Sequence, residues 1–422
     1  MPGEMTALPS PAVDPARTLA ELKDLRALTG DENGAQRVAF TPRWLAARQF
    51  LKDRLAELPA EVHQDAAGNL WATLRGDSER ELLIGGHLDS VPGGGWLDGC
   101  LNVLAGLEVL RRVSAQYGGR PPVTLRLVDW ADEEGARFGR SLYGSSAASG
   151  FFDVTELAKL RDRDGVALGD ALREVGVTLE DAPQARAELA KAAAYLELHI
   201  EQGPVLEGLG LPLGAVLGTV GVERHTLTFR GQAAHSGSTP MNVRRDAFLA
   251  AGRFGQEIYA IAERHGGVCT VGSVKTWPGI VTSVVETCEL TLDQRHLDAG
   301  KLAAMWQDAQ DAARRFAEEG GCTVDFGYLW NIEPIPFHPE LIDAAEASIL
   351  EVTPATHRLP SGPLHDAAEV ARAGVPTVML FVQSLRGISH NKIEDTREDH
   401  IALSVQALDR LTTRAMAWVQ ER

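Results

Sequence analysis

Short apolar strands and amphipathic helices alternate along the first part of the chain. Three consecutive apolar residues, 82–84, lead into a glycine pair and His87. Leucines then recur at helical spacing, which predicts a helix over 101–113, and a strand is predicted over 123–128. Further elements are predicted at 17–28, 43–58, 69–74, 339–350 and 377–381. Strand, helix and strand at this spacing indicate an α/β fold with a mostly parallel sheet and crossover helices.

A different order of elements occupies residues 219–331. Alternating apolar and polar side chains predict a strand over 224–230, and an apolar stripe predicts a helix over 244–264. The elements that follow are predicted at 268–275, 284–293, 299–318 and 322–328. The order βαββαβ is that of a ferredoxin-like unit. We therefore predict two domains, one formed by residues 1–218 and 332–422 and one inserted at 219–331.

Composition and charge narrow the classes of function. The chain has 422 residues, enough for two domains, and 44% of them are hydrophobic. Lysine and arginine total 41 against 58 for aspartate and glutamate, a net charge of −17 that disfavours nucleic-acid binding. The four cysteines lack CxxC spacing, which is typical of a reducing cytoplasm. Residues 1–17 contain no apolar run that would indicate a signal peptide, and no segment is apolar enough to predict a membrane span.

Histidines and carboxylates gather where the predicted strands end. His87 closes one strand, and Asp89 lies on the same side two residues later, where its carboxylate can fix the imidazole tautomer. Asp98 comes just before the predicted helix. Glu133 and Glu134 follow the next strand, and neighbouring side chains in extended backbone diverge. One of the two can therefore bind a metal ion while the other faces substrate as a base.

Two more histidines complete the set. His199 ends a strand-like segment, and His390 follows the last predicted strand. Taken singly, such residues are usually structural or solvated, but the carboxyl ends of parallel strands meet at one edge of a sheet. Three histidines with two or three carboxylates suit Zn²⁺, Mn²⁺ or Co²⁺ better than Mg²⁺ or Ca²⁺. Five ligands with one bridging carboxylate can hold two such ions about 3.5 Å apart.

Six segments carry a more specific resemblance. They read GGHLDSVPGGGWLDG, DEEGARFG, LELHIEQGPVLE, AAHSGSTPM, LDQRHLD and GISHN, in order from about residue 86 to residue 391. These segments resemble the hydantoinase/carbamoylase branch of the dinuclear-metal aminoacylase-type amidohydrolases. That branch includes N-carbamoyl-L-amino acid hydrolases, β-ureidopropionases and allantoate amidohydrolases. The resemblance implies an aminopeptidase-like catalytic domain and a lid or dimerisation domain inserted into it.

The resemblance also implies a role for each candidate residue of the catalytic domain. Asp98 would bridge two metal ions, with Glu134 and His390 completing one site and His87 and His199 the other. Glu133 would be the general base that activates the metal-bridging water, and Asp89 would orient His87. A histidine at 199, where the related peptidases carry a carboxylate, favours this branch over a peptidase.

Substrate contacts are implied mainly for the inserted domain. His235 resembles the histidine that stabilises the tetrahedral oxyanion, often donated by the partner subunit of a homodimer. Arg295 resembles the arginine that clamps the substrate carboxylate through a bidentate fork. Gln202 is either a contact to the ureido group or a structural amide.

Three departures from the family pattern bear on specificity. Thr282 stands where the family has an asparagine that helps to hold the substrate carboxylate. Pro363 and Leu364 replace the alanine and glycine of the usual SGAGHD segment, and Gln383 replaces a proline. None of these positions is a predicted metal ligand, but all lie in segments expected to shape the pocket.

We therefore expect a cytoplasmic, homodimeric hydrolase that cleaves a linear amide or ureide C–N bond with two divalent ions, Zn, Mn or Co. An N-carbamoyl-L-amino acid is the leading substrate, and no nucleic-acid or membrane partner is expected. Allantoate is the closest alternative, followed by an N-acyl amino acid or another small amide. A metal-free binding protein that keeps only the fold is the weakest alternative, because Glu133 and all five ligand positions are intact.

Overall fold

The computed structural model describes residues 11–422. Residues 1–10 lie outside this range. They belong to the segment 1–17, in which the sequence predicts no signal peptide. The chain forms two compact units. Unit 1 consists of the residues up to Leu217 together with Phe337–Arg422, and unit 2 consists of Gly218–Pro336. The second unit ends later than the insertion expected at 219–331 because its last long strand runs to Ile332 and a short strand, Ile335–Pro336, follows.

Unit 1 is built on a nine-stranded sheet in the order β13-β8-β15-β7-β5-β6-β4-β3, with β14 paired to β8. The last two residues of β8 and the short edge strand β13 are the two ends of the segment Gly218–Pro336. The strands are β3 (Glu61–Gln64), β4 (Leu70–Leu74), β5 (Ser78–His87), β6 (Val123–Trp130), β7 (Ala192–Ile200), β8 (Leu213–Thr219), β13 (Ile335–Pro336), β14 (His357–Ser361) and β15 (Thr377–Val382). β15, β7, β5 and β6 run parallel, whereas β8 and β4 join this group antiparallel. The predicted α/β class with a mostly parallel centre is confirmed, but the antiparallel flanks were not predicted.

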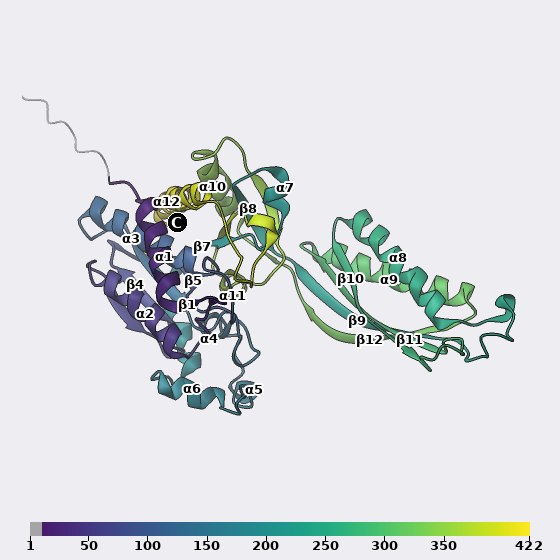
Figure 1. The fold of residues 1–422 in the computed structure, drawn as a ribbon. Helices are drawn as coiled ribbons and strands as arrows, with labels where there is room; N and C mark the ends of the chain where they lie inside the picture. The colour runs from purple at the N-terminus through teal and green to yellow at the C-terminus, as the bar shows by residue number, and fades with distance from the viewer. Residues whose placement is uncertain (1–10) are drawn as a thin grey trace, which may run out of the picture. The chain divides into compact units, whose positions relative to one another are not determined.

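The helices of unit 1 cover this sheet (Figure 1). They are α1 (Pro15–Thr29), α2 (Pro42–Leu55), α3 (Cys100–Tyr117), α4 (Tyr143–Ser149), α5 (Val154–Leu157), α6 (Leu168–Glu174), η1 (Ala182–Leu189), α7 (Val205–Leu209), α10 (Pro339–Leu350), α11 (Asp366–Arg372), η3 (Leu385–Gly387) and α12 (Glu398–Gln420). A small hairpin, β1 (Gly30–Asp31) and β2 (Gly34–Ala35), follows α1. α3 and α12 contact the central strands and each other, and their leucines and valines lie in one continuous core.

Close backbone packing fixes the strand that ends at His87. A Cβ atom on Gly86 would lie 2.7 Å from Nδ2 of Asn102 in α3, and one on Gly85 would overlap the ring of Tyr195 in β7. Only glycine allows β5 to approach both neighbours so closely. The same register sets His87 beside Trp130 at the end of β6. The carboxyl ends of the four parallel strands therefore meet at one edge of the sheet.

Unit 2 is a four-stranded antiparallel sheet in the order β10-β11-β9-β12. Its elements are β9 (Gly221–Arg230), η2 (Met241–Val243), α8 (Ala247–His265), β10 (Val268–Trp277), β11 (Thr287–His296), α9 (Ala299–Glu319) and β12 (Thr323–Ile332). Both long helices lie on one face of the sheet (Figure 1), where Phe254, Met305 and their apolar neighbours form a second core. α8 begins at Ala247 rather than at the predicted 244, because Asp246 caps it by accepting from the backbone N–H of Phe248 and Leu249.

Among the described residues, no helix combines the length and apolar character needed to cross a bilayer.

Candidate metal centre

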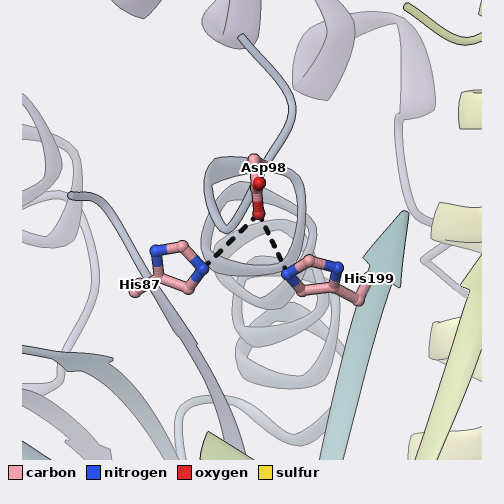
Figure 2. A group of neighbouring side chains, drawn as sticks. All are labelled: His87, Asp98 and His199. Atoms are coloured by element: carbon pink, nitrogen blue, oxygen red, sulfur yellow. Dashed lines mark ion pairs between the residues drawn. The ribbon is translucent and has the colours of Figure 1, made fainter. Parts of the chain in front are cut away.

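Three buried side chains converge at the carboxyl edge of the unit 1 sheet (Figure 2). His87 is the last residue of β5, His199 lies near the end of β7, and Asp98 comes from the loop before α3. Oδ1 of Asp98 lies 3.1 Å from Nε2 of His199 and 3.6 Å from Nε2 of His87. The three side chains are at most 3% exposed. Their ligand atoms are close enough together to hold one metal ion.

A second group shares Asp98. Its other oxygen, Oδ2, lies 3.4 Å from Nε2 of His390, which in turn lies 3.2 Å from Oε2 of Glu134. The ligand atoms of Asp98, Glu134 and His390 could also hold an ion. Each carboxylate oxygen of Asp98 thus faces a separate pair of side chains. This is the arrangement expected of a carboxylate that bridges two ions.

Hydrogen bonds inside the protein orient the two buried imidazoles for metal binding. Nδ1 of His87 lies 3.1 Å from the carbonyl oxygen of Asp89, and Nδ1 of His199 lies 2.9 Å from that of Ile200. A carbonyl can only accept, so Nδ1 carries the hydrogen in each ring. This leaves Nε2 of each ring, which faces Asp98, as the nitrogen that can bind a metal ion. The donor set of imidazole nitrogens and carboxylate oxygens fits Zn²⁺, Mn²⁺ or Co²⁺.

The electrostatics of the centre also favour bound positive charge. Burial alone would lower the pKa of His87, yet the nearby carboxylates of Glu133, Asp89 and Asp98 raise it well above its usual value. The hydrogen bond that His390 donates to Glu134 raises the pKa of His390 to about 9. Surplus carboxylate charge thus stabilises a cation at this edge of the sheet.

Asp89 organises more than the imidazole it was expected to orient. Its carboxylate accepts from the backbone N–H groups of Glu133, at 3.2 Å, and Glu134, at 3.1 Å. Oδ1 of Asp89 lies 3.6 Å from Nδ1 of His87, whose hydrogen bond goes to the Asp89 carbonyl instead. One buried aspartate therefore fixes both the His87 ring and the turn that carries the two glutamates.

Glu133 lies beside the centre without belonging to either ligand group. Its Oε2 lies 3.8 Å from Nε2 of His87, and the residue is 8% exposed. Burial raises the pKa of its carboxyl well above the usual range, and Asp366, Glu134 and Asp89 act in the same direction. Such a carboxylate can take and return a proton near neutral pH.

Gln202 lies against the second oxygen of Asp98. Its Nε2 donates to Oδ2 of Asp98 and to Oγ of Ser389, both at 3.0 Å. The backbone of Gln202 is left-handed, with φ 56°, as is that of His390, with φ 54°. Non-glycine residues in this region are uncommon and gather at functional sites. The sequence could not foresee the Ser389 contact, because it joins the loop after β7 to the loop after β15.

The sequence also missed a buried group behind His199. The ring of His365 packs on that of His199 with centroids 4.3 Å apart, and Glu197 completes a third set of ligand-type atoms. Oε2 of Glu197 already accepts from the Tyr195 hydroxyl and from the backbone N–H of Ala367. Burial lowers the pKa of His365 well below its usual value, so the ring is neutral. This group therefore packs against the His199 ring and helps to fix its position.

The predicted substrate residues of the inserted domain all belong to unit 2. His235 and Thr282 lie on paired segments, since His235 bridges to Ser283 and the carbonyl of Thr282 accepts from the N–H of Ser236 at 3.0 Å. Nε of Arg295 donates to Oδ1 of Asp293 at 2.8 Å. Asp293 thereby orients the guanidinium at the end of β11.

The remaining family departures differ in their surroundings. The side chain of Gln383 is 5% exposed and donates to the carbonyl of Leu211 at 3.1 Å, so it ties two backbone segments together instead of lining a pocket. The carbonyl of Pro363 accepts from Oγ of Ser361, which also lies 2.9 Å from Nε2 of His365. The substituted segment 361–365 is thus connected to the ring that packs on His199.

Comparison with known proteins agrees with this geometry. The chain is 35% identical to the allantoate amidohydrolase of Escherichia coli over 91% of its own length and 93% of the relative's. It is likewise 35% identical to the N-carbamoyl-L-amino acid amidohydrolase of Geobacillus stearothermophilus, over 89% and 92% of the two chains. A crystal structure of a hydantoinase/carbamoylase family amidase from Burkholderia multivorans superposes with a TM-score of 0.85 at 31% identity, covering 97% and 99% of the two chains.

These matches confirm the resemblance drawn from the six sequence segments. The model of Peptidase family M20/M25/M40 matches residues 83–414, a span that contains every one of the candidate metal, catalytic and substrate residues. The chain belongs to Peptidase family M20/M25/M40.

Proposed function

We propose that this protein hydrolyses the ureide bond of N-carbamoyl-L-amino acids with two divalent metal ions. The observation that carries the proposal is Asp98, whose two oxygens face the His87–His199 pair and the Glu134–His390 pair separately. The relatives named as carbamoyl amino acid and allantoate amidohydrolases support hydrolysis of a non-peptide C–N bond. His199 in place of a carboxylate supports this reaction over peptide hydrolysis.

His87, Asp98, Glu134, His199 and His390 would hold the ions, which we propose to be Zn, Mn or Co. When bound, such ions lower the pKa of a water molecule and polarise the scissile carbonyl. Glu133 would take a proton from the attacking water as the water oxygen bonds to the ureido carbon, and would deliver this proton to the nitrogen that leaves when the C–N bond breaks. Asp89 keeps Glu133 in place through the backbone of the turn.

Recognition of the substrate is proposed for unit 2 and Gln202. Arg295, oriented by Asp293, would clamp the substrate carboxylate, and Thr282 would contribute one hydroxyl beside it. His235 would donate a hydrogen bond to the developing oxyanion. The Gln202 amide, which contacts Asp98, would meet the ureido group.

Unit 2 is also the proposed lid and dimer interface. Its sheet has free edges at β10 and β12, which expose Val274, Trp277, Tyr328 and Trp330. Two copies could pair at such an edge around a two-fold axis. Sedimentation tests the dimer, and mixing Glu133→Gln with His235→Ala subunits tests whether His235 acts across it. A mixed dimer would regain one working site only if His235 serves the partner's centre.

A cytoplasmic location is proposed as well. All four cysteines, Cys100, Cys269, Cys288 and Cys322, are free, and three of them are buried. Free thiols are typical of a reducing compartment.

Ammonia release from a substrate panel tests the reaction. Protein loaded with Mn²⁺, Co²⁺ or Zn²⁺ should hydrolyse N-carbamoyl-L-amino acids, lose activity on chelation and leave the D-enantiomers intact. Glu133→Gln protein, prepared in parallel, controls for a contaminating enzyme. Turnover of allantoate without turnover of any carbamoyl amino acid would identify allantoate as the substrate instead. The similarity to the allantoate amidohydrolase of Escherichia coli supports this second candidate. Turnover of N-acyl amino acids alone would overturn both.

A further inference from the structure

A buried glutamate outside the predicted ligand set joins the two loops that carry metal residues. Glu394 is 2% exposed and follows His390 in the loop before α12. Its Oε1 accepts from the backbone N–H groups of Leu97, at 3.2 Å, and Asp98, at 3.1 Å. A Cβ atom on Gly95 would overlap this carboxylate, so the loop packs directly on it. Glu394 thereby fixes the backbone that presents Asp98.

The other oxygen of Glu394 controls a hydroxyl beside Asp98. Oγ of Ser389 lies 2.9 Å from Oε2 of Glu394 and 3.1 Å from Oδ2 of Asp98. A hydroxyl has one hydrogen to donate, so the two carboxylates compete for it. Nε2 of Gln202 donates to the same hydroxyl oxygen at 3.0 Å. The shorter distance favours donation from Ser389 to Glu394.

We propose that Glu394 is a positioning residue for the second metal ion: it holds the Asp98 loop and takes the Ser389 hydrogen away from Oδ2 of Asp98. Oδ2 is the oxygen that faces His390 and Glu134. With the Ser389 hydrogen directed elsewhere, that oxygen accepts from Gln202 but not from Ser389, and keeps more of its negative charge for the ion. This inference rests on the proposed metal centre and adds a residue that acts through its ligands.

A substitution can separate the two tasks of Glu394. In Glu394→Gln the amide oxygen must face the N–H groups of Leu97 and Asp98, because only an acceptor suits them. The amide nitrogen then faces Ser389 and donates to it. The hydroxyl can no longer donate in that direction and turns to Oδ2 of Asp98. The loop contacts survive, while the oxygen proposed for the second ion gains a hydrogen bond from Ser389 in addition to the one from Gln202.

The test is a metal titration with Mn²⁺ by calorimetry, with no substrate present. It is run at one fixed pH for all variants. Glu394→Gln should lower the affinity for the second ion by about tenfold or more, which is the range seen when the hydrogen-bond partners of metal ligands are changed. The affinity for the first ion should change by less than about threefold, because the atoms that face it, Nε2 of His87, Nε2 of His199 and Oδ1 of Asp98, are not the ones that contact Ser389.

The double variant Glu394→Gln/Ser389→Ala distinguishes this role from simple loosening of the loop. Without the hydroxyl, Oδ2 of Asp98 loses the added donor and keeps its hydrogen bond from Gln202, so the affinity for the second ion should return to within about threefold of that of Ser389→Ala alone. Wild-type affinity in Glu394→Gln, or no recovery in the double variant, would overturn the proposal. If Glu394→Gln does not fold, Ser389→Ala alone tests the proposal. A tenfold loss of affinity for the second ion in that variant would show that Ser389 serves Asp98 directly, and would overturn the proposal. A wild-type protein that binds no ion at all would instead refute the metal centre itself.

Discussion

The two units hold their candidate site residues in opposite ways. In unit 1, His87, Asp98 and His199 are at most 3% exposed, and their ring nitrogens and carboxylate oxygens have partners within the protein. In unit 2, the Arg295 side chain is 33% exposed, and His235 and Thr282 are exposed as well. The buried group is preorganised by its surroundings, whereas the exposed group is held by strand pairing and one ion pair. We therefore expect substitutions in unit 1 to abolish metal binding or catalysis, and those in unit 2 to change substrate affinity.

The largest effect should come from the residue shared by both ligand groups. Asp98→Ala removes both oxygens at once and leaves His87 and His199 without their common partner. We expect both proposed ions to be lost and activity to fall below detection, as elemental analysis and an ammonia-release assay would measure. Asp53→Ala, in an exposed stretch of α2, is the matched control. If Asp98→Ala retained two ions, the bridging role would be wrong.

Glu133→Gln should leave metal binding intact while removing the base. The amide keeps the shape of the side chain but cannot accept the proton, so kcat should fall by about 10²-fold or more with little change in KM. Glu134→Gln is the neighbouring control and should lose metal instead. Simultaneous loss of metal and activity in Glu133→Gln would make Glu133 a ligand.

Much of unit 1 could be predicted because its signals are local. His87 and Asp89 are two residues apart, Glu133 and Glu134 are adjacent, and each pair follows an apolar strand whose register sets its place at the sheet edge. The helix expected at 101–113 begins at Cys100 and runs to Tyr117, and nearly all of its residues up to Ser114 are buried. The roles given to these residues remain predictions that the experiments above test.

What escaped prediction depends on contacts between distant segments. Glu394 meets the backbone of Asp98, and His365 meets His199, only after β5, β7 and β15 have paired. The antiparallel strand β8 was missed because the segment around Gly214 mixes glycine and apolar residues without alternation. Gln383 looked like a pocket residue from its neighbours, yet its side chain binds the carbonyl of Leu211. Hydrogen-bond partners of this kind leave no periodic signal in the sequence.

Arg295→Ala should have the larger effect of the two substitutions considered in unit 2. Loss of a charge that pairs with a substrate carboxylate should cost about 2 kcal/mol, the lower end of the range for such pairs, because the side chain is one-third exposed. That corresponds to roughly thirtyfold in kcat/KM, with metal content unchanged. Arg224→Ala is the control, because Arg224 also pairs with Asp293, at 2.8 Å. Equal losses in both variants would indicate a structural role for the arginine pair.

The smallest effect is expected at Thr282, where the chain departs from its family. The side chain is exposed, and its backbone carbonyl accepts from Ser236 whatever the side chain, so a substitution should not disturb the fold. Thr282→Asn offers two amide hydrogens where threonine has one hydroxyl, and should raise kcat/KM for N-carbamoyl-L-amino acids by about threefold to tenfold. Thr282→Ala removes the hydroxyl and should lower kcat/KM for the same substrates. If the wild type already turns over these substrates rapidly and Thr282→Asn only impairs it, threonine belongs to the native pocket. The pair of variants thus decides whether unit 2 is a carbamoylase pocket adapted to another ligand or one that recognises the carboxylate with a hydroxyl.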